Sequence, residues 1–361
     1  MKNWYRLLAG RPTATVGVDI GAREIKVAKV KKSGTVPEVV AVGRFPTPPD
    51  AIANGIDGER LAPALKKAVE STGAKVEDVT AAAGGDKVII RNIRLPVMPE
   101  KEVESAVRWE AEKHIPVPLG ELVLRHATLG EVTADGVRQL QVLLAAIPLK
   151  TAYEYYNLFQ QAGLKLVAID LQTFALWRVF AGSQKPPPSG TVAVIDIGSA
   201  VSQFVVLRDG KIELTRTMTV GGDTVTEAFA RAYGVDFAEA ERIKTEEGGI
   251  AIAAGEVAAA VEPAALKINA ALGEGLSEIV RGIRQSLSWY SSQNREQPVE
   301  RIILCGGGAK LKGLTAFLTE ELGLPVDLGH PGIRMHTANP EEEYDPSLAV
   351  AIGLALREVV D

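Results

Sequence analysis

Two aspartates, each followed after one residue by a glycine, are the side chains of this sequence best placed to do chemistry. They are Asp19-x-Gly21 and Asp196-x-Gly198, and each closes an apolar, β-branched run that is typical of a buried strand. A carboxylate there is costly unless a cation compensates its charge, and the glycine lets another group approach the backbone closely. The pattern predicts a bend that presents a carboxylate and two chain segments to a metal-bound phosphate.

The segment after each bend is repeated as well. An apolar stretch follows both glycines and reaches a turn, at Lys31–Gly34 in the first copy and at Arg208–Lys211 in the second. Two copies so far apart along the chain indicate two halves of similar topology rather than a solenoid. We therefore expect both bends to lie on one cleft. For either copy alone, a buried strand that simply ends in a turn is the alternative.

The strands and helices expected around these bends are those of an α/β protein with two lobes. A Gly- and Pro-rich segment, 182–190, is the clearest linker in the chain. The expected parts are a first lobe at 13–86, 167–182 and 346–361, an inserted β-α-β-β-α-β subdomain at 87–166, and a second lobe at 190–345.

Composition limits the classes of function. The chain has 361 residues, a net charge of -5, 46% hydrophobic and 24% charged residues, which is ordinary for a globular protein with a large core. Lysine and arginine are spread along the chain, so no nucleic-acid footprint is indicated. A single cysteine excludes an internal disulfide and favours a reducing compartment. No apolar run approaches the ~20 residues of a membrane span, and no secretory signal is evident, so we expect a cytoplasmic protein.

Two glycine loops can face a ligand. Gly306–Gly308 lies between an expected strand and an expected helix, where backbone N–H groups can meet an anion or a nucleotide, and Gly221–Gly222 precedes another helix. Leu311 excludes a dinucleotide fingerprint, and Leu314 after Gly313 excludes a P-loop. A purely structural turn is the alternative for each loop.

The remaining reactive residue types give weaker signals. Cys305 is expected to be a small buried apolar residue, because no activating histidine or cation neighbours it in sequence. The four histidines show no metal-ligand spacing, so zinc is not expected.

Taken together, these segments resemble the actin, hexokinase and Hsp70 superfamily of ATPases. More closely, they resemble the FtsA-like, actin-like PilM family of type IV pilus assembly. The residues that carry this resemblance span nearly the whole chain: Val18–Gly21, Arg91–Pro99, Trp109–Glu112, Ile115-Pro116, Ile195–Gly198, Gly221–Thr224, Ala240–Lys244, Cys305–Gly308 and Pro346–Leu356. The implied fold is a two-lobed actin-like ATPase fold of duplicated ribonuclease H-like lobes, with the insertion placed as in FtsA.

The resemblance also implies a role for particular residues. Asp19 and Asp196 would hold magnesium. The phosphates of ATP would be contacted by Gly21, Lys26, Gly198 and Ser199. The sugar, phosphates and adenine would be contacted by Gly221, Gly222, Glu241, Lys244, Gly306, Gly307 and Gly308. These are residue types that magnesium and phosphate require: carboxylates near a hard cation and backbone donors near phosphate.

Two departures from the family pattern concern a phosphate contact, which Ala22 loses or leaves to the backbone, and hydrolysis. The first bend carries Ala22 where relatives have a hydroxyl. Related ATPases orient water with a Glu or Gln after the inserted subdomain, and the candidates here are Asp170 and Gln172. The expectation is ATP binding with slow or negligible hydrolysis.

The function that the resemblance implies is a cytoplasmic ATP-binding scaffold. It would bind the cytoplasmic N-terminal peptide of the inner-membrane protein PilN, beside the inserted subdomain, and so join the inner-membrane pilus assembly platform. One alternative is a small-molecule kinase of the same superfamily with Asp170 as general base. An FtsA-like division protein is disfavoured because Leu348–Asp361 shows no basic amphipathic membrane helix.

Overall fold

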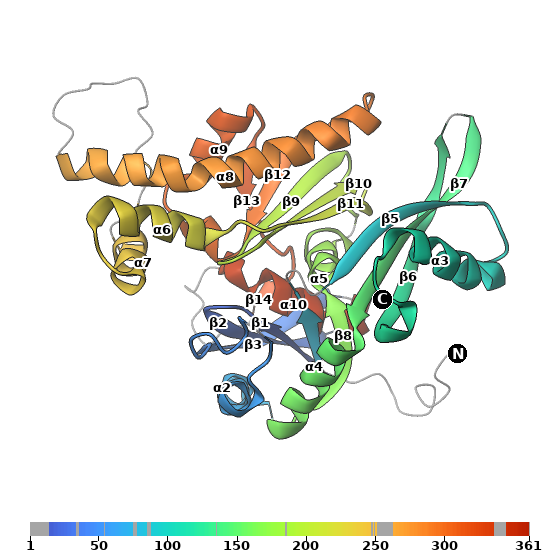
Figure 1. Ribbon diagram of the computed structural model, residues 1–361, viewed down its shortest axis with the longest axis horizontal. Coiled ribbons are helices and arrows are strands. Elements are labelled where there is room, and N and C mark those ends of the chain that lie inside the picture. The colour runs from blue at the N-terminus through green and yellow to red at the C-terminus, as the bar shows by residue number, and fades with distance from the viewer. Residues whose placement is uncertain are drawn as a thin grey trace. The chain divides into compact units, whose positions relative to one another are not determined.

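The computed structural model describes residues 14–33, 36–53, 55–74, 78–84, 88–134, 136–184, 186–246, 248, 250, 263–335 and 344–360. The chain divides into two compact units (Figure 1). The first comprises Met1–Pro187 and Pro331–Asp361, and the second comprises Pro188–His330.

A six-stranded sheet forms the centre of the first unit. Its strand order is β14-β3-β2-β1-β4-β8. The strands are β1 (Ala14–Ile20), β2 (Glu24–Ser33), β3 (Val36–Pro46), β4 (Asp78–Ala83), β8 (Lys165–Leu171) and β14 (Arg334–Met335). The first three strands are antiparallel neighbours, whereas β4 runs parallel to both β1 and β8. The carboxyl ends of β1, β4 and β8 therefore lie at one edge of the sheet.

Helices bury the apolar residues of this sheet. They are α2 (Gly58–Glu70), α4 (Leu149–Gln161), α5 (Gln172–Trp177), the π-helical turn η3 (Arg178–Gly182), the 3-10 turn η5 (Pro346–Leu348), α10 (Ala349–Ala355) and α11 (Arg357–Val360). Helix α10 lies directly on β1, because a Cβ added to Gly17 would be 2.1 Å from the carbonyl oxygen of Ala351. A larger side chain at Gly17 would push this helix away from the strand that carries Asp19.

A three-stranded antiparallel sheet follows β4 in the chain. Its order is β5-β7-β6, and its elements are β5 (Ile89–Pro96), α3 (Glu100–His114), η2 (Leu119–Glu121), β6 (Leu122–Ala134) and β7 (Val137–Pro148). Val103, Val107 and Ala111 of α3 pack onto this sheet and close a separate core. The sheet and α3 thus form a small subdomain with its own hydrophobic interior.

The predicted β-α-β-β-α-β order of the insertion is present, but its last two elements pack elsewhere. Tyr155, Leu158 and Phe159 of α4 belong to the core of the six-stranded sheet, and β8 pairs with β4. The inserted subdomain therefore ends near Pro148 and not at residue 166. The apolar face of α4 predicts that the helix is buried, yet the pattern does not specify which of two sheets covers it.

The second unit repeats the strand order of the first. Its sheet has the order β11-β10-β9-β12-β13, with β9 (Thr191–Ile197), β10 (Ser202–Arg208), β11 (Lys211–Met218), β12 (Arg301–Cys305) and β13 (Val326–Leu328). As in the first unit, three antiparallel strands are followed by two strands parallel to the first. The duplication predicted from the two bends is thus confirmed at the level of topology.

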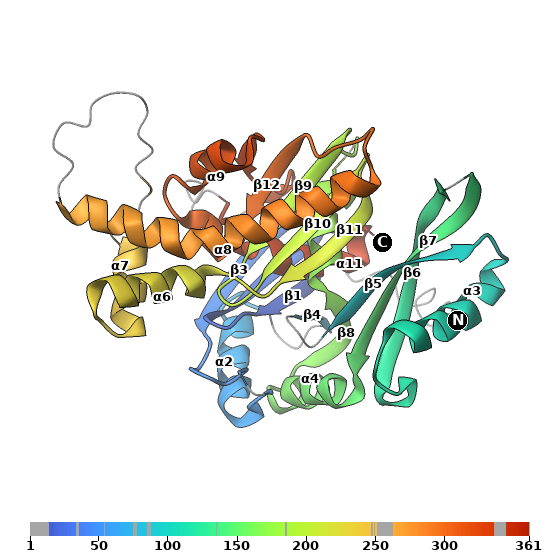
Figure 2. The same cartoon turned by 45° about the horizontal axis from the view of Figure 1, so that its top comes forward.

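The helices of the second unit are α6 (Gly222–Tyr233), α7 (Phe237–Glu246), α8 (Pro263–Gln293), the 3-10 turn η4 (Gly307–Lys310) and α9 (Leu314–Leu322). The long helix α8 runs along the sheet, as both ribbon views show (Figures 1 and 2). Leu276, Ile279 and Ile283 anchor it in the core. Within the described ranges, no helix is both long enough and apolar enough to cross a membrane.

The boundary at the end of the second lobe needs correction. We expected 190–345 to form that lobe, but Pro331–Asp361 groups with the first unit. Strand β14 pairs in parallel with β3, with Arg334 opposite Glu38 and Met335 opposite Val39. Two residues are too short a pattern to reveal a strand in the sequence.

Candidate functional site

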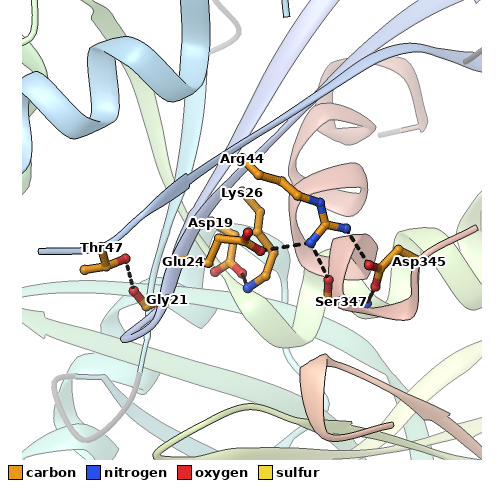
Figure 3. Close-up of polar contacts among 8 residues, drawn as sticks. All are labelled: Asp19, Gly21, Glu24, Lys26, Arg44, Thr47, Asp345 and Ser347. Atoms are coloured by element: carbon orange, nitrogen blue, oxygen red, sulfur yellow. Dashed lines mark hydrogen bonds and ion pairs between the residues drawn. The ribbon is translucent and has the colours of Figure 1, made fainter. Parts of the chain in front are cut away.

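The first bend joins β1 to β2 and carries Asp19. The Gly21 N–H donates to the Glu24 carbonyl at 3.1 Å and closes the turn. Asp19 lies opposite Lys26 in the strand register, and the Lys26 Nζ is 3.5 Å from an Asp19 carboxylate oxygen (Figure 3). Both side chains are largely buried, so the ammonium compensates the cost of placing this carboxylate at the end of a buried strand.

Thr47, the residue that follows strand β3, holds this bend from one side. The Thr47 hydroxyl donates to the Gly21 carbonyl at 2.7 Å, and the Thr47 N–H donates to the Arg23 carbonyl at 3.0 Å. Thr47 is 7% exposed, so the hydroxyl bond is shielded from water. The sequence analysis missed Thr47, because residues 26 positions apart give no local signal of contact.

Arg44 links the first bend to the C-terminal part of the chain. Its guanidinium lies 2.9 Å from Glu24, 2.7 Å from Asp345 and 3.2 Å from the Ser347 hydroxyl (Figure 3). Asp345 also accepts the Ser347 N–H at 2.9 Å, which caps the turn η5. This network connects three segments that are distant in sequence around the strand that follows Gly21.

The neighbouring strand ends bring two more residues to the same edge of the sheet. Gly84 follows β4 and Gln172 follows β8, and a Cβ added to Gly84 would lie 3.0 Å from the Gln172 amide. The Tyr155 hydroxyl bonds to the backbone of Gly84. Burial, together with the charge of Asp19, raises the pKa of Tyr155 well above its usual range, so the phenol stays neutral.

Asp170, the candidate general base, has a different role in the structure. Its carboxylate lies 2.9 Å from the Arg178 guanidinium and 3.3 Å from that of Arg357. One of its oxygens also accepts the Leu171 N–H at 2.7 Å. Asp170 therefore joins β8, the π-helical turn η3 and α11, and a carboxylate held by two guanidinium groups is a structural ion pair rather than an available base.

The second bend has the same backbone geometry as the first. The Gly198 N–H donates to the Val201 carbonyl at 3.1 Å, and Asp196 stands opposite Gln203 on β10. On its other side, Asp196 is the register partner of Cys305 on β12. Burial, and then the charge of Asp196, raises the pKa of the Cys305 thiol well above its usual range. The buried, unreactive thiol agrees with the role expected for this residue.

The three glycines after β12 differ in whether a larger residue could take their place. Gly306 has φ +88°, and a Cβ there would lie 2.1 Å from an Asp196 carboxylate oxygen. A Cβ at Gly308 would lie 2.4 Å from the Ile197 side chain, whereas one at Gly307 would meet nothing within 4 Å. Gly306 and Gly308 thus let the loop pass directly over the second bend, and Gly307 is not needed for packing.

The Gly221–Gly222 loop also closes on the second bend. The Gly222 N–H donates to the Gly198 carbonyl at 2.8 Å, and the Asp223 N–H donates to the Ser199 carbonyl at the same distance. A Cβ at Gly221 would lie 2.4 Å from the Ser199 carbonyl oxygen. In the second unit, the structure thus gathers around Asp196 the glycines that the sequence singled out.

Two further predicted residues lie on α7 and reach this loop. The Lys244 ammonium lies 2.6 Å from the Glu241 carboxylate and donates to the Gly222 carbonyl at 3.2 Å. Thr226 of α6, which the sequence analysis did not single out, hydrogen-bonds to both side chains. Threonine carries no motif signal on a helix, so only the fold reveals this contact.

The side chains and N–H groups at the two bends suit a magnesium ion that keeps most of its waters better than a metal ion enclosed by protein ligands. Each unit offers one aspartate beside a turn of backbone N–H groups, at Asp19 and at Asp196. In the described part of the chain, no cluster of three or more histidine, cysteine or acidic side chains could enclose a metal. Magnesium keeps several waters and is commonly held by one or two carboxylates together with substrate phosphates.

Comparison with known proteins places this arrangement in a family. The family described as Type IV pilus assembly protein PilM matches residues 17–359. A solved chain of a PilM-PilN type IV pilus biogenesis complex is 31% identical, with a TM-score of 0.81, and the match covers 97% of this chain and 99% of that one.

More distant relatives share the fold. The cell division protein FtsA of Borreliella burgdorferi is 23% identical over 94% of this chain and 90% of its own length. The cell shape-determining protein MreB of Escherichia coli is 31% identical over 37% of this chain and 44% of its own length. MreB5 of Spiroplasma citri bound to ADP is 13% identical with a TM-score of 0.53, covering 97% of this chain and 98% of that one. These relatives support an actin-like fold.

Proposed function

The chain belongs to the PilM family of type IV pilus assembly proteins, and from that premise we propose that it is an ATP-binding scaffold that captures the cytoplasmic N-terminal peptide of PilN. The observation that carries the proposal is the likeness, over 97% of the chain, to a protein in a PilM-PilN complex. PilN, as an inner-membrane protein, would hold the scaffold at the membrane.

The two bends support the nucleotide part of this proposal. Asp19 and Asp196 would hold magnesium, which supplies charge compensation for the phosphates. The N–H groups near Gly21 and Gly198 and the Ser199 hydroxyl are donors suited to phosphate oxygens. Lys26 would exchange its contact with Asp19 for a phosphate. The solved MreB5 relatives bound to ADP and AMPPNP have the same fold.

Hydrolysis has weaker support than binding. Ala22 follows Gly21, so the first bend offers no hydroxyl where Ser199 offers one in the second. Asp170 is engaged by two arginines, which leaves the kinase alternative without its general base. We therefore propose binding with slow or negligible turnover.

The distribution of exposed apolar side chains supports the proposal that this chain binds a partner. Of nine large hydrophobic residues that are exposed in the described part of the chain, six fall between positions 97 and 167: Val97, Trp109, Val137, Tyr153, Tyr156 and Val167. Exposed apolar side chains on the inserted subdomain, and on α4 and β8 that follow it, can offer apolar contacts to another chain. This region covers the inserted subdomain and the elements that follow it.

A thermal-shift experiment tests the nucleotide part. ATP with magnesium at about 100-fold its Kd should stabilise the protein by about 2.7 kcal/mol and raise the melting temperature by several degrees. Asp196→Ala should abolish the rise. Asp327→Ala removes the same charge from an exposed position of β13 and should leave the rise intact. An unchanged melting temperature in the wild type would contradict nucleotide binding.

A peptide titration tests the partner part. A fluorescent peptide with the PilN N-terminal sequence should show increased anisotropy with the wild type, and Tyr156→Ser should weaken binding about tenfold or more. Trp289→Ser is the matched control, because Trp289 is 52% exposed against 53% for Tyr156 but lies on α8 of the second unit. Equal losses in both variants would argue against docking at 97–167.

A further inference from the structure

Strand β11 (Lys211–Met218) is the outermost strand on one side of the second unit's sheet (Figure 2). Among the described residues, only β10 pairs with it. In an antiparallel ladder, every second residue directs its N–H and C=O away from the partner strand. The outer side of β11 therefore carries main-chain donors and acceptors that no described strand uses, and such a row is a template for a further strand.

Only the second half of this edge is regular. The pairing of β11 with β10 shifts at Glu213, which forms a β-bulge, and the Glu213 carboxylate lies 2.5 Å from the Arg208 guanidinium. A bulge and a lysine, here Lys211, hinder the pairing of another strand with an edge. Residues Leu214–Met218 follow the bulge with an unbroken register against β10. They are the part of the edge that suits the addition of a strand.

An exposed tryptophan stands beside this part of the edge. Helix α8 runs past β11, because a Cβ added to Gly282 would lie 3.0 Å from the Met218 sulfur. One turn further along the helix, the Ser286 hydroxyl accepts from the Arg216 guanidinium at 3.3 Å. Trp289 follows Ser286 by three residues, so it lies on the same side of α8 and further toward the start of β11. Trp289 is 52% exposed, so its indole offers apolar surface next to the strand edge.

The edge also carries a cation without a counter-charge. Arg216 is exposed, and no carboxylate of the described residues pairs with it. Its guanidinium bonds to the neutral Ser286 hydroxyl of α8, so Arg216 and Trp289 lie on the same side of the edge. Side chains on one side of a strand are two positions apart. A segment with an apolar residue and a carboxylate at this spacing would therefore meet both residues.

We propose that Leu214–Met218 and Trp289 form a docking site for an extended acidic segment of another protein, which joins the sheet as a strand beside β11. Main-chain bonds hold the segment, Trp289 contacts its apolar residue and Arg216 pairs with its carboxylate. A second copy of this chain fits the edge less well, because it would bring its own Arg216 and Lys211 to cations of the same sign. The site shares no residue with the proposed nucleotide and PilN sites.

Binding of a labelled model peptide tests this site. The peptide Thr-Glu-Thr-Val-Thr-Glu-Thr places glutamate and valine on one side of a strand, and its fluorescence anisotropy is followed as the full-length protein is added. The wild type should bind it with a Kd below about 100 μM. Trp289→Ser and Arg216→Gln should each weaken binding about tenfold. Leu328→Ser is the matched control and should leave binding unchanged, because Leu328 is 54% exposed on β13 at the opposite edge of the same sheet.

Two N-methylated forms of the peptide test whether it binds as a strand. One is methylated on the threonine nitrogens and the other on the glutamate and valine nitrogens, so that each lacks the N–H groups of one edge. Because only one edge of the peptide faces β11, one form should lose binding and the other should retain it. Equal effects of the two methylations, or equal binding of a peptide with lysine in place of glutamate, would overturn the proposal. So would a wild type that does not bind the peptide, or a wild-type dimer that Trp289→Ser dissociates, since the edge would then belong to a second copy.

Discussion

The two Asp-x-Gly bends share a backbone and differ in what holds it. In each, the glycine N–H closes the turn onto the carbonyl three residues later at 3.1 Å. The carbonyl of Gly21 accepts from the Thr47 side chain, whereas the carbonyl of Gly198 accepts from the Gly222 backbone. The same acceptor is thus satisfied by a replaceable side chain in one unit and by the main chain in the other. The duplication preserved the turn and not its support.

The carboxylates differ as well. Lys26 stands opposite Asp19, but the equivalent register position opposite Asp196 is the neutral Gln203. Gly306 leaves room beside Asp196 where any side chain would intrude. The first aspartate therefore has a cation of the protein at hand. The second is shaped by close glycine contacts, which suits approach by a hydrated ion and its phosphate.

The largest expected effect comes from breaking the glycine contact of the second bend. Gly306→Ala adds a Cβ 2.1 Å from an Asp196 oxygen and 2.5 Å from the Ile197 carbonyl, at φ +88°. Strain and clash together should lower the free energy of unfolding by about 4 kcal/mol, measured by urea denaturation followed by circular dichroism.

Gly307→Ala is the matched control, because the added methyl meets nothing within 4 Å and the backbone is not left-handed. It should change the free energy of unfolding by less than about 0.5 kcal/mol. Similar losses for the two alanines would show that the loop tolerates no change at all, and the specific contact with Asp196 would lose its support.

Sequence alone predicted the parts of the site that repeat. Two apolar runs that end in Asp-x-Gly specify strands, bends and a duplicated topology, because each signal lies within a few neighbouring residues. The glycines at 221, 222, 306 and 308 were also identifiable, since a close approach of backbones requires glycine. In the second unit the structure brings these glycines to the bend that carries Asp196, while their contact with a nucleotide stays a prediction.

The sequence did not predict which polar side chains hold the bends and loops in place. Thr47, Arg44 and Thr226 are ordinary polar residues whose partners are fixed by the fold, with Arg44 and Asp345 separated by 301 positions. Asp170 was chosen for its residue type and its place after the insertion, but the approach of Arg178 and Arg357 decides its role. Contacts of this kind depend on three-dimensional packing, for which a single sequence has no periodic signal.

A smaller effect should follow from removing the side-chain support of the first bend. Thr47→Val deletes the donor to the Gly21 carbonyl and should lower the free energy of unfolding by about 1 kcal/mol. The affinity for magnesium-ATP should also fall, because the peptide unit of this carbonyl carries the Ala22 N–H, which then loses its fixed direction. Titration calorimetry and urea denaturation measure the two effects.

Thr47→Ser retains the hydroxyl and should recover most of both losses. The second bend offers no equivalent experiment, since the corresponding donor is the N–H of Gly222. If Thr47→Val left nucleotide affinity unchanged, the support from β3 would matter for stability only, and the contrast between the bends would not extend to binding.

The smallest effect concerns the strand next to each bend. Beside the first, β4 ends in the alanines at 81–83, whereas beside the second, Cys305 pairs with Asp196. Burial and the charge of Asp196 raise the pKa of the folded thiol well above its usual range, while an unfolded thiol has a pKa of about 8.5. Above that pH the unfolded chain releases a proton that the folded chain keeps, so the free energy of unfolding must fall.

Cys305→Ala removes this titration. Between pH 8 and 10, the wild type should therefore lose up to about 1.4 kcal/mol per pH unit more than the variant, as measured by urea denaturation at each pH. Tyr155, whose pKa is also raised, is present in both proteins and cancels in the difference. Parallel curves would mean that the thiol ionises in the folded protein as readily as in the unfolded chain. Neither burial nor the charge of Asp196 would then raise the pKa of the thiol, and this difference between the two bends would lose its support.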